Sequence, residues 1–217
     1  MKGHNLFISL SRPKIVWQEN TMTRRSPYQP LLLRLLHGSN ALLVMAAIVT
    51  GFWIYNTFDH RWFKLPLPRI NSILEIHGAI GTIFLVVTLL FTLYSVAIGH
   101  RRLIQSNSLT KLAEVGNSIW WYTLHRFTNT AMLIAALFAL VTGQLMHGSW
   151  LPSGELTHLE YSLHLAAWTM LIAGLMLHLL MSVKVGGLPL LWSIAHLKYR
   201  SEDSPKLWLQ KLRHRQE

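Results

Sequence analysis

The sequence YSLHLAAWTMLIAGLMLHLLMSV, residues 161–183, is apolar almost throughout and contains two histidines, His164 and His178. A helix needs about 20 apolar residues to cross a bilayer, so this segment predicts a membrane span. The histidines are 14 positions apart, and at about 100° per residue this spacing returns them nearly to the same helix face. With a rise of about 1.5 Å per residue they lie about 21 Å apart along that face, so we expect one imidazole near each leaflet.

Three further segments are long and apolar enough to span a bilayer, which predicts an all-α, integral membrane four-helix bundle. The chain is 51% hydrophobic and only 13% charged, whereas soluble domains carry about a quarter charged residues. Apolar runs of this length and continuity argue against strands. The expected spans are approximately Leu35–Phe58, Ile76–Gly99, Trp121–His147 and Leu159–Val183.

The basic residues predict the orientation of the bundle. Of the 20 lysines and arginines, 16 lie in the N-terminal arm, the connection between spans two and three, and the tail. Cytoplasmic segments are enriched in basic residues, so both termini are expected in the cytoplasm. The orientation of the bundle therefore explains the net charge of +11. We expect the protein to contact lipid and not nucleic acid, because no basic patch alternates with exposed aromatic residues. The expected divisions are a cytoplasmic N-terminal arm (1–30), the four-helix domain (31–185) and a cytoplasmic amphipathic and basic tail (186–217), whose segment 188–200 is expected to be an interfacial helix.

Two more histidines match the depths of the first two. With this orientation, His37 lies in the first turn of span one, near the inner leaflet. His178 lies near the end of span four, at the same depth. His77 begins span two near the outer leaflet, at the depth of His164. The depths therefore predict two pairs, His37 with His178 and His77 with His164.

The residue types favour haem iron as the ligand of these pairs. The chain has no cysteine, which excludes iron–sulfur clusters, disulfides and covalent haem attachment within it. Zinc prefers three or four compact ligands, whereas haem iron with two imidazoles is complete and suits electron transfer. A single membrane histidine is more often a structural hydrogen-bonding group, but four that satisfy spacing, face and depth favour haem ligation. Gly38, Gly78 and Gly81 lie beside these histidines and would leave room for a planar group.

The motifs around these histidines resemble a known family. They are R-x-x-H opening the first span (Arg34 to His37), H-x-x-x-G opening the second (His77 to Gly81), H-x13-H in the fourth, KLAEVGN at 111–117, VTG at 141–143 and VKVGG at 183–187. Over residues 30–200 the pattern resembles the four-helix di-haem cytochrome b family, which includes the formate dehydrogenase gamma subunit and the nickel–iron hydrogenase cytochrome b subunit.

The resemblance implies two haem b groups whose iron is bound by His37, His77, His164 and His178. It also implies electron transfer between an iron–sulfur or other redox subunit at the outer face and a quinone near the cytoplasmic side. The chain would then be an electron-transfer subunit of a larger oxidoreductase rather than a stand-alone catalyst, with no catalytic residue of its own. It would lie in the plasma membrane or an internal energy-transducing membrane.

Two features of the sequence allow more than one interpretation. His125 and Arg126 stand where the family has an Asn and Gln pair near its quinone site, so they are candidates for quinone or haem propionate contacts, or for interfacial anchoring. The main rival function is a haem-free membrane anchor or assembly subunit whose histidines are structural. A histidine-lined channel is disfavoured, because the middle of each span is almost purely apolar.

Overall fold

The computed structural model of the chain describes residues 29–195, 200–205 and 207, which are helical and contain no strand. Four helices in this part of the chain are long and apolar enough to cross a membrane, which confirms the predicted all-α membrane bundle. The long helices are α1 (Leu31–Ile54), continued by the π-helical turn η1 (Tyr55–Asp59), α2 (Ile73–Ala97), α4 (Ser118–Gln144) and α5 (Leu159–Ala195). The short ones are η2 (His100–Arg102), α3 (Ser108–Lys111) and η3 (Ser201–Asp203).

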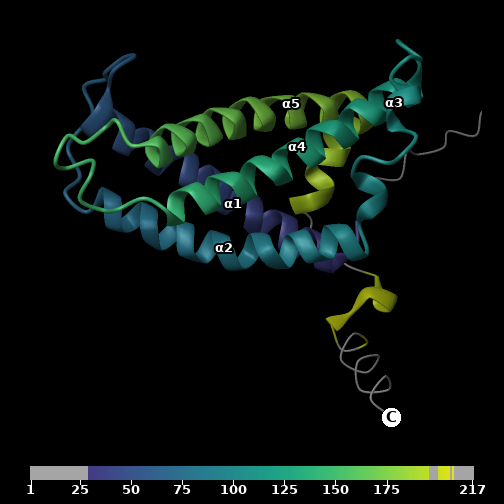
Figure 1. Ribbon diagram of the computed structural model, residues 1–217. Helices are drawn as coiled ribbons and strands as arrows, with labels where there is room; N and C mark the ends of the chain where they lie inside the picture. Colours follow the sequence, from purple (N-terminus) through teal and green to yellow (C-terminus); the bar gives the residue numbers. More distant parts are fainter. Residues whose placement is uncertain (1–28, 196–199, 206, 208–217) are drawn as a thin grey trace, which may run out of the picture.

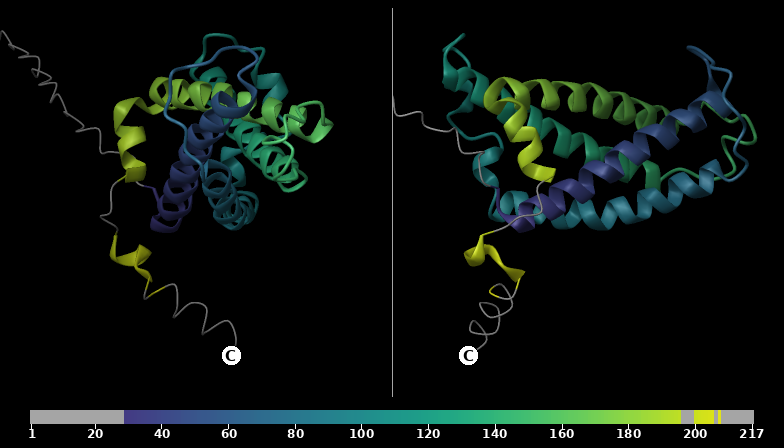
Figure 2. Two further views of the ribbon diagram at one scale, coloured as in Figure 1. Left: turned by 90° about the vertical axis from the view of Figure 1, so that its left-hand side faces the viewer. Right: turned by 180° about the vertical axis from the view of Figure 1, so that it is seen from behind.

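The helices form two antiparallel hairpins, α1 with α2 and α4 with α5 (Figure 1). Packing is extensive within each hairpin and much sparser between the hairpins. The start of α1 and the end of α5 lie at the same end of the bundle (Figure 2). We call this the inner end, after the orientation that the basic residues predict, and the opposite end the outer end.

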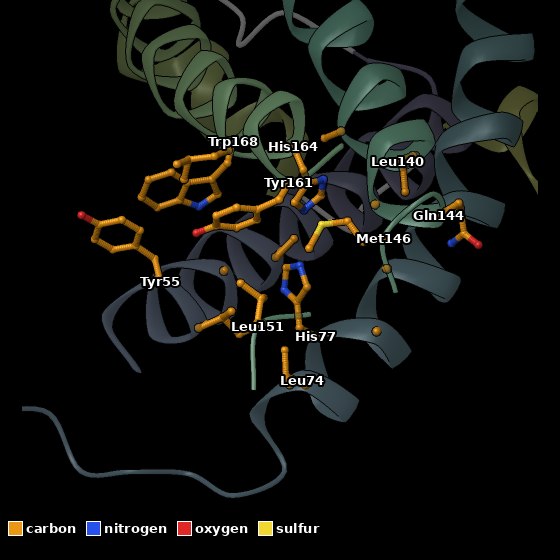
Figure 3. Close-up of a pocket in the computed structure, with 18 of the residues that line it drawn as sticks. Tyr55, Leu74, His77, Leu140, Gln144, Met146, Leu151, Tyr161, His164 and Trp168 are labelled. Carbon is orange, nitrogen blue, oxygen red and sulfur yellow. The ribbon is translucent and has the colours of Figure 1, made fainter. Parts of the chain in front are cut away.

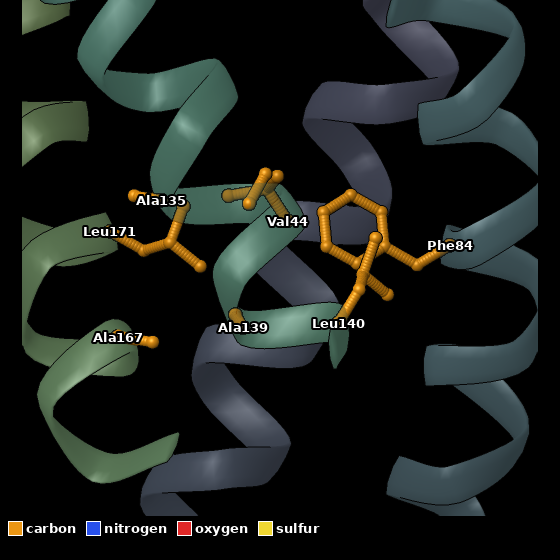
Figure 4. Packing of buried hydrophobic residues seen from close by; sticks show 8 residues of the cluster. Val44, Phe84, Ala135, Ala139, Leu140, Ala167 and Leu171 are labelled. Atoms are coloured by element: carbon orange, nitrogen blue, oxygen red, sulfur yellow. The ribbon is translucent and has the colours of Figure 1, made fainter. Parts of the chain in front are cut away.

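An apolar cluster closes the middle of the bundle. Its small residues on α4 let that helix approach α5 closely, and Phe84 of α2 and Val44 of α1 complete it from the other hairpin (Figure 4). Along α5 the cluster residues Ala167 and Leu171 stand between His164 and His178. The two ends of the bundle interior are therefore separated by packed hydrocarbon. The buried members are Val44, Phe84, Ala135, Ala136, Ala139, Leu140, Ala167 and Leu171.

The outward surface of the spans is also apolar. Leu42, Leu93, Val141 and Leu180 on the four spans are each more than half exposed, at 74%, 67%, 59% and 58%. In water such a surface would be unfavourable, since exposed apolar patches of this extent are normally covered by a partner or by lipid. This surface agrees with an integral membrane protein.

Most helix ends differ from the predicted spans by two to four residues, as two examples show. The first helix begins at Leu31, four residues before the predicted Leu35, directly after Pro30, which is the N-cap residue and has no N–H to donate. The third span ends at Gln144 rather than His147. Both differences lie at the boundaries, where sequence patterns are least informative.

The last long helix continues past the predicted end at Val183 but changes direction at Gly187. This glycine has φ 67° and ψ −175°, which is not helical, and Pro189 follows it. Residues 188–195 then run as a separate helical segment across the inner end, toward the start of α1 (Figure 2). They belong to the interfacial helix expected at 188–200, of which 196–199 lie outside the described residues. The N-terminal arm up to residue 28 and most of the basic tail after 205 also lie outside them.

Candidate functional site

At the outer end, His77 of α2 and His164 of α5 face each other across the gap between the hairpins. Their ring centroids are 6.2 Å apart. Both rings line a cavity of about 220 Å³, whose other lining side chains are mainly apolar. Figure 3 shows both rings at this cavity, with Tyr161 and Trp168 beside them. The structure therefore brings together the pair that was predicted from depth.

Each histidine of the outer pair contacts a threonine hydroxyl through Nδ1. Thr50 Oγ1 lies 2.7 Å from His77 Nδ1, and Thr142 Oγ1 lies 3.1 Å from His164 Nδ1. Both hydroxyls already donate their single proton to a backbone carbonyl of their own helix, at 2.7 Å for Thr50 and 2.8 Å for Thr142. Each hydroxyl oxygen can then accept from the imidazole, which favours the histidine tautomer with the proton on Nδ1. That tautomer has a lone pair on Nε2, as a metal ligand needs.

The inner pair has a similar arrangement with an amide as the partner. The ring centroids of His37 and His178 are 6.0 Å apart, and His178 Nδ1 lies 2.9 Å from Asn129 Oδ1. Asn129 Nδ2 donates to the carbonyl of Arg102 at 3.0 Å, which identifies Oδ1 as the oxygen that accepts from His178. His37 Nδ1 is buried and has no hydrogen-bond partner among the described residues.

The spacing of both pairs suits a metal atom between two imidazoles. Two bonds of about 2 Å from ring nitrogens to a central metal place the ring centroids about 6 Å apart. Among the described residues no group of three or more His, Cys, Asp or Glu side chains could hold a bare metal ion. A pair of imidazoles alone instead fits a metal that brings its other donors with it, as haem iron does.

Glycines leave space around the histidines. A Cβ atom added at Gly143 would lie 3.0 Å from His164 Cε1, and one at Gly51 would lie 3.5 Å from His77 Cε1. An added Cβ at Gly38, Gly78 or Gly81 would meet no heavy atom within 4 Å. The first two glycines let the rings lie close to neighbouring helices, and the other three border open space where the sequence predicted room for a planar group. These residues fit haem.

The structure brings His125 to the inner pair. Its ring centroid lies 5.4 Å from that of His178, and its Nε2 lies 3.3 Å from Ser182 Oγ. Ser182 Oγ donates to the carbonyl of His178 at 2.8 Å, so it accepts the proton of His125 Nε2. Arg126 is the next residue on α4 and therefore points about 100° away around that helix; its side chain is partly buried.

The residues that hold the histidine rings were not found from the sequence. Thr50, Thr142 and Asn129 each lie on a different helix from the histidine that they contact. No spacing within one helix reveals such a partner. Thr142 belongs to the quoted VTG segment, which was the one available signal.

Comparison with known proteins gave one match. The family model described as prokaryotic cytochrome b561 matches residues 28–194. This range contains the four spanning helices, except for the last residue of α5, and all four paired histidines. Comparison with curated proteins and with solved structures gave no match.

Proposed function

Because the chain belongs to the prokaryotic cytochrome b561 family, we propose that it is a transmembrane di-haem cytochrome that carries electrons between a redox partner at the outer face and the quinone pool. The family and the four spanning helices make it an integral membrane cytochrome of the b type that takes part in electron transfer. We propose further that the chain binds two haems through the histidine ligands given below, and that it exchanges electrons with a redox partner and with quinone.

The proposed haem ligands are the two histidine pairs. His77 and His164 hold one haem at the outer end, and His37 and His178 hold the other at the inner end. The observation that carries this assignment is the partner of Nδ1 at three of these residues. Nδ1 of His77, His164 and His178 lies within hydrogen-bond distance of an oxygen on another helix, and with the proton on Nδ1 each Nε2 is free for iron.

The chain's own residues then have three tasks. A b haem held by two imidazoles supplies reversible one-electron transfer and has no open coordination position. The helices hold the imidazole rings at a set separation, and the hydrogen bonds at Nδ1 set ring orientation and ligand basicity. The apolar cluster between the two ends excludes water from the interior, which keeps the local dielectric low. Residues 31–185 are the segment that we assign to these tasks.

The inner end offers the polar groups that a quinone requires. Quinone reduction needs hydrogen-bond donors near the carbonyl oxygens and a route for protons. His125 Nε2–H faces Ser182 and lies against His178, so a small rotation of the imidazole would present this donor to a ligand. His125 and Arg126 are therefore proposed as contacts to the quinone or to the propionates of the inner haem.

The partner at the outer face is proposed to be an iron–sulfur or other redox subunit. The chain has no cysteine with which to bind a cluster itself. An electron donor or acceptor outside the membrane must therefore be supplied by another chain or by a soluble molecule. Under this proposal the chain is an electron-transfer subunit rather than a stand-alone catalyst.

A reduced-minus-oxidised visible spectrum of the detergent-purified protein, with haem quantified per chain, tests the proposal. We expect two low-spin b haems per chain, and His164→Ala and His178→Ala should each lose one of them. The matched control is His100→Ala, because His100 is exposed outside the spans; it should retain both. One haem in the unmodified protein would refute the two-site assignment. No haem after expression with ample haem would favour the membrane anchor instead.

A further inference from the structure

A buried carboxylate lies at the outer end of the first span. Asp59 is the last residue of the π-helical turn η1, and its side chain is completely shielded from solvent, with 0% exposed. The next residue, His60, has a left-handed backbone with φ 43°, which ends the helix and turns the chain back over the bundle. A carboxylate is rarely buried without partners, because desolvation of the charge is costly.

Asp59 has two side-chain partners of different kinds. Arg61 Nε lies 2.7 Å from Oδ1 and 3.0 Å from Oδ2 of the carboxylate, and the Tyr161 hydroxyl donates to Oδ2. Tyr161 belongs to the first turn of α5, so this contact joins the end of the first span to the start of the last. Arg61 also reaches toward the carbonyl of Leu156, at 3.5 Å.

Tyr161 connects the carboxylate to the outer histidine pair. Its side chain lines the same cavity as His77 and His164, as Figure 3 shows. Asp59 is thus one side chain away from the place where the outer haem is proposed to bind. At the inner end, the described residues show no acidic side chain in contact with His37 or His178.

The opposite charges of Asp59 and Arg61 do not contribute equally to the electrostatic potential in this cavity. The Arg61 side chain is 41% exposed, whereas that of Asp59 is 0% exposed. Water screens the exposed cation strongly, while the buried anion acts through a medium of low dielectric. The cavity therefore experiences a net negative potential. Reduction of a haem adds an electron, and a nearby negative charge disfavours it, so the reduction potential falls.

We propose that Asp59, held by Tyr161 and Arg61, is a positioning residue that lowers the reduction potential of the outer haem. The proposal rests on the proposed function, since it requires a haem between His77 and His164. Asp59 does not bind the iron in this proposal, but its charge changes the difference between the reduction potentials of the two haems. A purely structural role for Asp59, as a tie between two helices, would affect stability without a directed change of potential.

Potentiometric titration of the purified two-haem protein, followed in the visible spectrum, tests this inference. Asp59→Asn keeps the shape of the side chain and removes its charge, so the midpoint potential of one haem should shift upward. Arg61→Gln removes the cation and leaves the carboxylate, so the midpoint of the same haem should shift downward, by less than Asp59→Asn raises it, because water already screens the exposed guanidinium. That haem should be the one that His164→Ala loses, and the other midpoint should not change.

Glu75→Gln is the matched control, because Glu75 is an exposed carboxylate in the first turn of α2, two residues before His77. It should leave both midpoints in place. If Asp59→Asn prevents haem loading, the Arg61→Gln shift decides alone, since that side chain is largely at the surface. Unchanged midpoints in these variants, equal shifts of both haems, or the same shift with Glu75→Gln would overturn the inference. If the unmodified protein lacks two haems, the proposed function fails before any titration is done.

Discussion

Under the proposed function, single threonines keep Nε2 of the two outer histidines free for haem iron. Thr142 and Thr50 each donate the hydroxyl proton to a carbonyl of their own helix. The hydroxyl oxygen can then accept a proton from Nδ1 of a histidine on another helix. Loss of such a partner usually reduces metal-site affinity by about 10- to 100-fold, because the ring is then free to rotate and to change tautomer. Substitution of the threonine that contacts a histidine therefore tests the site more specifically than substitution of the histidine itself.

Thr142→Val should weaken haem binding at the outer site and leave the inner site intact. Valine has the shape of threonine but cannot accept from His164 Nδ1. We expect a loss of affinity of about 10- to 100-fold at one site, measured by titrating haem into the haem-depleted protein. The control is Thr169→Val on α5, an exposed threonine whose hydroxyl donates to the carbonyl of Leu165 in its own helix. Full outer-site affinity in Thr142→Val, or an equal loss in Thr169→Val, would contradict the tautomer argument.

Among the elements, α5 carries the most information and also the largest deviation from a regular helix. It bears one histidine of each pair, so its straight part between His164 and His178 sets the distance between the two histidine pairs. Gly187 ends that straight part with φ 67° and ψ −175°, a combination that is essentially restricted to glycine. The segment beyond it crosses the inner end of the bundle (Figure 2).

Gly187→Ala should destabilise the protein or straighten the end of α5. A side chain in this backbone conformation costs about 1 to 3 kcal/mol, and Pro189 Cδ would lie 3.3 Å from the new Cβ. The measurement is thermal unfolding in detergent, followed by circular dichroism. Leu188→Ala is the control, because that neighbouring side chain is 61% exposed and its removal leaves the backbone free. A melting temperature for Gly187→Ala equal to that of the control would show that the turn is not under this constraint.

The elements also show what a sequence can and cannot predict here. The spacing of His164 and His178 is a property of one helix, so the predicted face and depth needed only helix geometry. The spans were visible because lipid requires long apolar runs. The hydrogen bonds of Thr142 to His164 and of Asp59 to Tyr161 join residues far apart in the chain. Such contacts depend on how the helices rotate against each other, which no local pattern encodes.

For the whole molecule, the sparse packing between the two hairpins and the apolar cluster have one consequence. The hairpins meet in the middle through side chains such as Val44, Phe84 and Leu171. At the outer end they meet through the contact of Asp59 with Tyr161, beside the apolar cavity at His77 and His164. Under the proposed function, this shared frame holds one haem at each end. Which end faces the cytoplasm follows from the basic residues alone, so the orientation needs a direct test.

The absence of cysteine from the sequence allows this test without background labelling. Ser153→Cys lies in the exposed connection between α4 and α5, and Ser106→Cys in the exposed connection between α2 and α4. If the basic residues face the cytoplasm, a membrane-impermeant maleimide should label Ser153→Cys in intact cells or spheroplasts. Ser106→Cys should react only after the membrane is opened. The reverse pattern would invert the bundle, place His37 and His178 at the outer leaflet, and move the proposed quinone contacts to the opposite side of the membrane.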